Sequence, residues 1–95
     1  MTKEEQESLT ATVENALAMV RVNLDELFEL ERLSGEDIKA IARGDRLVTA
    51  DEAWEISNSI GCAAEDSHKW EYEIAEHLRW LHETGKIRSY GPLRR

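Results

Sequence analysis

The hydrophobic residues of the chain recur mainly three and four positions apart, and no stretch alternates with period two over the length of a strand. A spacing of three and four places side chains on one face of an α-helix. The stripe is clearest from Leu9 to Val20. Helices are predicted over about residues 5–21, 24–31, 35–43, 50–60 and 66–84. The predicted fold class is therefore all-α, a small domain of about five helices that ends in a longer C-terminal helix.

Polar residues mark the starts of three of these helices. A side-chain oxygen followed three positions later by an acid is typical of a capping box, in which each side chain accepts a hydrogen bond from the other residue's backbone amide. The pairs are Asn23 with Glu26, Ser34 with Asp37, and Thr49 with Glu52. Glycine after a hydrophobic stretch is typical of the left-handed residue that ends a helix. We expect such helix ends at Gly44, Gly61 and Gly85.

The 95 residues are enough for one small domain with a hydrophobic core. Twenty acids against twelve bases give a net charge of −8, which argues against nonspecific binding to nucleic acid or to anionic membranes as the main activity. The longest uncharged hydrophobic run, from Ala16 to Val20, is far shorter than the ~20 residues of a membrane span. The N-terminus is too polar for a signal peptide and Cys62 is the only cysteine, so we expect a cytoplasmic protein with no internal disulfide and no membrane contact.

The charge is unevenly distributed along the chain. Residues 1–83 hold all the acids, whereas residues 84–95 hold four bases and no acid. We therefore expect a single helical domain over residues 1–85 and a basic tail over residues 86–95. Three alternatives stay open for the tail: it is unstructured, it lies along a nucleic-acid backbone or an acidic partner, or it folds back onto its own acidic domain.

From position 22 to position 61, the order of hydrophobic residues, caps and glycines resembles the helix-turn-helix domain of the Cro and phage-repressor type. The matching residues are Val22, Asn23, Leu24, Leu27, Leu30, Leu33, Ser34, Ile38, Ile41, Arg43, Gly44, Arg46, Thr49, Ile56, Ile60 and Gly61. The resemblance implies that residues 1–21 form the first helix of the domain and that residues 35–43 form the recognition helix. As a DNA-binding protein, the chain would read DNA with Gly35, Glu36, Lys39, Arg43 and Arg46.

Departures from the family pattern change the expected function. Phe28 stands where the family usually has a small residue at the crossing of the two motif helices, and Arg32 stands where the turn often has glycine. The motif face is also acidic, with Asp25, Glu26, Glu29, Glu36 and Asp37. Carboxylates there would meet phosphates, and a like-charge contact in a desolvated interface costs several kcal/mol. This acidic motif face therefore favours a basic protein surface over DNA as its partner.

Large aromatic residues indicate an interface with another protein. On the last predicted helix Trp70 lies with the core stripe, whereas Tyr72 and Trp80 lie outside it. Tyrosine and tryptophan are frequent interface anchors because they bury a large and rigid area. We expect Phe28, Trp70, Tyr72 and Trp80 to be such anchors, in a homodimer or against another protein. The alternative is that Tyr72 and Trp80 are single, half-exposed aromatics.

Patterns of catalytic or metal-binding residues are weak. His77 and His82 do not share a helix face, and Glu73 with His77 makes only two ligands, for which a surface ion pair is the better interpretation. Cys62 has no neighbouring base in the sequence, and the glycines form no phosphate-binding loop. We therefore expect no enzyme activity, no cofactor and no metal.

Two main hypotheses of function follow. In the first, the chain is a small regulator, an antiactivator or inhibitor that binds a transcription factor through the acidic motif face and the aromatic anchors. In the second, it is a dimeric, sequence-specific DNA-binding repressor or antitoxin of the Cro and phage-repressor type. A third alternative is a structural component of a phage or plasmid assembly.

Overall fold

A computed structural model describes residues 1–20, 33–63 and 68–90 of the chain. These residues form four helices, which are α1 (Lys3–Met19), α2 (Gly35–Ala42), α3 (Ala50–Ala63) and α4 (His68–Glu83). No strand occurs in the described ranges, so the predicted all-α class is confirmed. The count is four helices where about five were expected, and the helix expected over residues 24–31 lies outside the described residues.

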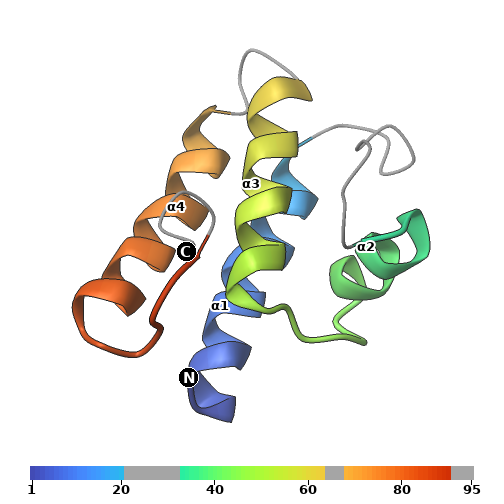
Figure 1. Ribbon diagram of the computed structural model, residues 1–95. Coiled ribbons are helices and arrows are strands. Elements are labelled where there is room, and N and C mark those ends of the chain that lie inside the picture. The colour runs from blue at the N-terminus through green and yellow to red at the C-terminus, as the bar shows by residue number, and fades with distance from the viewer. Residues whose placement is uncertain (21–32, 64–67, 91–95) are drawn as a thin grey trace.

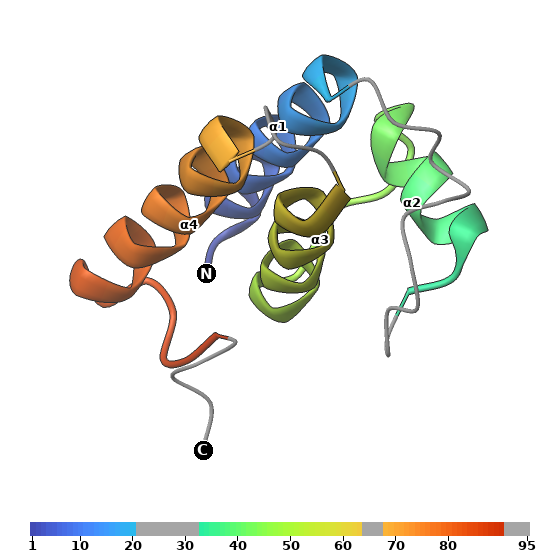
Figure 2. The ribbon, with the colours of Figure 1, turned by 90° about the horizontal axis from the view of Figure 1, so that it is seen from above.

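Three of the helices contact one another, and the fourth lies to one side. Helix α3 packs against both α1 and α4, and α1 also packs against α4 (Figure 1). The short α2 contacts α1 and lies on the side of the molecule away from α4, as Figure 2 also shows. The outward surfaces of α2 and α4 are therefore at opposite ends of the domain.

The core is built from the predicted hydrophobic stripes. Its buried residues are Leu9, Val13, Ala16, Leu17, Val20, Leu33, Ile38, Ile41, Val48, Ala53, Ile56, Ile60, Ile74, Leu78, Leu81 and Tyr90. Because these residues come from all four helices, burial of one continuous apolar cluster holds the helices together.

Two of the predicted capping boxes are present, and a third was not predicted. The amides of Ser34 and Asp37 donate to each other's side chains at the start of α2, as those of Thr49 and Glu52 do before α3. Helix α1 begins at Lys3, two residues before the expected start, because Thr2 forms the same box with Glu5. The pair Asn23 and Glu26 lies outside the described residues.

The predicted glycine helix ends are correct at two of three positions. Gly44 and Gly85 have positive φ angles of 81° and 74°, as a left-handed cap requires. Gly61 was expected to end a helix, but α3 continues through it to Ala63. A Cβ atom at this position would meet the carboxylate of Glu71 on α4. Gly61 therefore makes room for a side chain between α3 and α4, so its expected role as a cap is wrong.

The core continues past residue 85 into the segment expected to be a tail. Lys86 Nζ lies 3.1 Å from Glu5 Oε2, and Ile87 packs on the core. Tyr90 is buried, with its ring edge-on to Trp54 at 5.9 Å between centroids. This part of the segment therefore folds back onto the domain, which was one of the three alternatives. Residues 91–95 lie outside the described residues.

Candidate functional site

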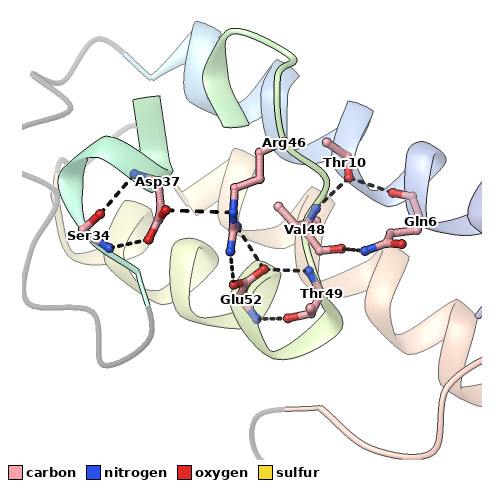
Figure 3. Close-up of polar contacts among 8 residues, drawn as sticks. All are labelled: Gln6, Thr10, Ser34, Asp37, Arg46, Val48, Thr49 and Glu52. Atoms are coloured by element: carbon pink, nitrogen blue, oxygen red, sulfur yellow. Dashed lines mark hydrogen bonds and ion pairs between the residues drawn. The ribbon is translucent and has the colours of Figure 1, made fainter. Parts of the chain in front are cut away.

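Arg46, one of the candidate DNA-binding residues, forms a paired ion contact in the loop between α2 and α3. Its Nη1 and Nη2 donate to the two carboxylate oxygens of Glu52 at 3.2 and 2.7 Å (Figure 3). The side chain of Glu52 is 9% exposed and that of Arg46 is 34% exposed. The Thr49 amide also donates to Glu52, at 2.9 Å. The bond to Glu52 and the nearby negative charge raise the pKa of Arg46. Because Arg46 makes two bonds to a nearly buried carboxylate, it serves the fold in this arrangement.

Asp37, part of the predicted acidic motif face, caps α2 and also lies near Arg46. The Ser34 amide donates to Asp37 Oδ2 at 3.0 Å, and Arg46 Nε lies 3.9 Å from Asp37 Oδ1 (Figure 3). The pKa of Asp37 is lowered, chiefly by the hydrogen bond from the Ser34 backbone and further by the Ser34 side chain and the charge of Arg46. The negative charge of Asp37 is therefore partly offset by Arg46, whereas the carboxylate of Glu36 beside it is 84% exposed.

The remaining candidate DNA-binding cations also have acidic neighbours. Lys39 Nζ lies 4.0 Å from Glu36 Oε1, and Arg43 Nε lies 3.0 Å from Asp45 Oδ2. Exposed pairs of this kind contribute little stability, so Lys39 and Arg43 could exchange a carboxylate for a phosphate. Arg46 differs, because a contact with a phosphate would leave the buried carboxylate of Glu52 without its cation. Gly35, the fifth candidate, is exposed at the first turn of α2.

Polar side chains of α1 hold the loop that carries Arg46 and were not predicted to matter. Gln6 Nε2 donates to the Val48 carbonyl at 2.8 Å. The Val48 amide donates to Thr10 Oγ1 at 3.0 Å, and this hydroxyl donates to the Gln6 carbonyl at 2.7 Å (Figure 3). Because these partners lie about forty positions apart in the sequence, spacing along one helix could not reveal them.

The outward side of α4 carries two exposed aromatic side chains. Tyr72 is 62% exposed and Trp80 is 52% exposed, so the prediction that both lie outside the core stripe is confirmed. Charged residues of α4 lie near these two aromatics. Arg79 Nη2 lies 2.7 Å from Glu76 Oε2, and Arg79 Nε lies 3.9 Å from Glu83 Oε1. Large exposed aromatics beside charged residues are typical of interface anchors with a polar rim.

The other predicted anchors are placed differently. Trp70 is partly buried and packs against the core, and the ammonium of Lys69 lies 4.9 Å from the centre of its ring. Trp70 therefore lies at the edge of the core, while Tyr72 and Trp80 face away from it. Phe28 and the acids Asp25, Glu26 and Glu29 lie outside the described residues.

His77 connects α4 to α1 beneath Trp80. Its Nδ1 lies 2.7 Å from Thr12 Oγ1, a hydrogen-bond distance. Its ring is edge-on to the Trp80 ring, with 6.3 Å between centroids. Burial lowers the pKa of His77, because the charged imidazolium is less well solvated there. His77 therefore links α4 to α1 and places its ring against that of Trp80.

Neither metal chemistry nor a membrane span is indicated by the described part of the chain. No cluster of three or more His, Cys, Asp and Glu side chains in these ranges is arranged to hold a metal ion. None of the helices described here is long and apolar enough to cross a bilayer. Comparison with protein families, curated proteins and solved structures found no match to this chain.

Proposed function

We propose that this chain is a small regulatory protein that acts as a homodimer by binding another protein, and that its target is a transcription factor. It would cover the DNA-binding or dimerising surface of that factor and so act as an antiactivator. The observation that carries this proposal is the charge balance around α2. A carboxylate lies within 4.0 Å of each cation that the helix-turn-helix resemblance implies would contact DNA, and these cations are Lys39, Arg43 and Arg46.

This charge balance favours a basic partner over DNA. Phosphate contacts supply most of the nonspecific affinity of DNA-binding proteins. Arg46 could make such a contact only by leaving the buried carboxylate of Glu52, whereas Lys39 and Arg43 would bring the exposed acids Glu36 and Asp45 close to the phosphates. The net charge of −8 would attract a basic surface and speed its association. The DNA-binding face of a transcription factor is such a surface. The resemblance of residues 22–61 to a helix-turn-helix domain makes a transcriptional setting the natural one.

The first experiment tests direct DNA binding, the competing function. The full chain is titrated into labelled promoter fragments from its source organism at low salt, and complexes are measured by gel shift and fluorescence anisotropy. We expect no tight complex. Tight binding that falls steeply with salt and is lost in Lys39→Glu, but kept in the matched α1 variant Lys3→Glu, would establish the repressor function instead.

The second experiment identifies the protein partner. The tagged chain is used to capture proteins from a lysate of the source organism, and each stoichiometric partner is purified and assayed for promoter binding. We expect one DNA-binding protein that loses its promoter complex when this chain is added. Because the side chain of Glu36 is 84% exposed, Glu36→Lys should weaken capture without unfolding the domain. Glu7→Lys on the exposed side of α1 is the matched control. Capture of no DNA-binding protein would contradict the proposed target.

A further inference from the structure

Five residues form a stripe along the outward side of α4, here called the outer α4 face. On a helical wheel they fall within about 80°, centred on Glu76 and opposite the core residues of the same helix. The stripe consists of Lys69, Tyr72, Glu76, Trp80 and Glu83. Glu76 is partly buried and the other four are exposed. Among the described elements, only α1 and α3 pack against α4, and they do so on its other side (Figure 2).

The outer α4 face is symmetric about its central residue. Tyr72 and Trp80 each stand four positions from Glu76, on opposite sides of it. Lys69 and Glu83 each stand seven positions from Glu76, again on opposite sides. An aromatic residue is therefore matched by an aromatic residue, and a cation is matched by an anion. If a second copy of α4 runs antiparallel to the first, with the two-fold axis at Glu76, each residue of the stripe lies level with its matched residue in the other copy.

We propose that the outer α4 face is the contact between two copies of this chain, paired as antiparallel helices about Glu76. In this arrangement Tyr72 of one copy lies level with Trp80 of the other, about 6 Å along the helix from the axis. Lys69 lies level with Glu83 of the other copy, about 10 Å from the axis. The inference deepens the homodimer of the proposed function and rests on it. It leaves the α2 end of the domain free for the target.

Charge explains why a second copy fits this face better than a basic partner does. The stripe with its two flanking residues Glu73 and Arg79 holds two cations and three acids, so it carries −1 although the whole chain carries −8. A nearly neutral, self-complementary face reduces the repulsion that two acidic molecules would otherwise have, and it offers a basic protein little net attraction. The one like-charge contact is between the two Glu76 side chains at the axis. In each copy Arg79 Nη2 lies 2.7 Å from Glu76 Oε2 and offsets the negative charge there.

The area available predicts a weak dimer. A tyrosine or tryptophan buries roughly 150–250 Å² at most, and about half of each ring is still exposed here, so four rings would bury on the order of 400 Å². That is well below the ~1,600 Å² of a standard protein interface. We therefore expect dimers that form and dissociate with concentration.

Analytical ultracentrifugation of the full chain over a range of concentrations up to millimolar tests the inference. The wild type should associate to a dimer and no further. Trp80→Ala should weaken the dimer at least tenfold, whereas Met19→Ala, which shortens a similarly exposed side chain on α1, should not change it.

A charge exchange separates the proposed pairing from any other dimer. Lys69→Glu and Glu83→Lys each place like charges opposite each other in a homodimer, so each variant alone should be more monomeric than the wild type. Mixed in equal amounts, they should form a heterodimer, because both contacts then join opposite charges. Circular dichroism confirms that both variants are folded.

Two results would overturn the inference. The first is a dimer that is insensitive to Trp80→Ala and to the charge exchange, which would place the contact elsewhere and leave the proposed homodimer standing. The second is a chain that stays monomeric at millimolar concentration, which would remove the homodimer as well. Neither result bears on the partner, because partner capture and DNA binding are measured separately with variants of α1 and α2.

Discussion

Replacing Arg46 with alanine should destabilise the fold far more than replacing Arg43, although both arginines carry the same charge and lie three positions apart. Arg46 makes two bonds to a Glu52 side chain that is 9% exposed, whereas Arg43 is 59% exposed and pairs with the equally open Asp45. Removing one partner of a fully buried ion pair costs about 3–5 kcal/mol. Because a third of Arg46 is still exposed, we expect a loss of about 2 kcal/mol.

The loss should be visible in both chemical and thermal unfolding. For a domain of this size, 1 kcal/mol shifts Tm by about 4–8 °C, so Arg46→Ala should lower Tm by about 8–16 °C. Arg43→Ala should change the free energy of unfolding by no more than about 0.5 kcal/mol. Urea denaturation followed by circular dichroism at neutral pH measures both variants under the same conditions.

A double-mutant cycle with Glu52→Gln isolates the charge interaction. Glutamine at this position still accepts the hydrogen bond from the Thr49 amide, so the cap on α3 is retained while the buried charge is removed. In that background Arg46→Ala should cost about 1 kcal/mol less than in the wild type. Equal losses for Arg46→Ala and Arg43→Ala, or the same loss in both backgrounds, would refute the assignment of Arg46 to the fold.

Three further predictions concern the glycines, the C-terminal segment and pH. Gly44→Ala should destabilise by about 1 kcal/mol in urea denaturation, because alanine is strained at a φ of 81°. Gly61→Ala should cost less, because alanine favours a helix interior and only the flexible end of the Glu71 side chain has to move; equal losses would contradict this. Tyr90→Ala should cost about 3 kcal/mol in the same assay, because it empties a buried aromatic site, and a loss near zero would show that the segment is not packed. The folded-state pKa of His77 lies below 6.5, so the unfolded chain takes up a proton first as the pH falls and stability should decline below pH 6.5. His77→Gln should flatten this decline in thermal unfolding at a series of pH values, and His68→Gln, at an exposed position, is the matched control for the loss of a histidine.

The features that the amino-acid sequence determined by itself are those set by neighbours three and four positions apart. The capping boxes of α2 and α3 join residues three positions apart, and the hydrophobic stripes repeat at the helical period, so both follow from the geometry of one helix. The outward position of Tyr72 and Trp80 follows in the same way, because a residue off the core stripe of a helix faces away from the core.

Only the tertiary structure decided which faces meet. The sequence predicts that a helix ends at Gly61. In the fold, α3 continues through Gly61, and the carboxylate of Glu71 on α4 lies against it. His77 lies within hydrogen-bond distance of Thr12, which is 65 positions away in the sequence. Tyr90 is part of the core, although the sequence predicted a domain that ends at residue 85. Arg46 was a candidate DNA-binding residue, but in the fold it pairs with the buried carboxylate of Glu52. Contacts between distant residues depend on how whole helices pack, and local periodicity carries no information about that packing.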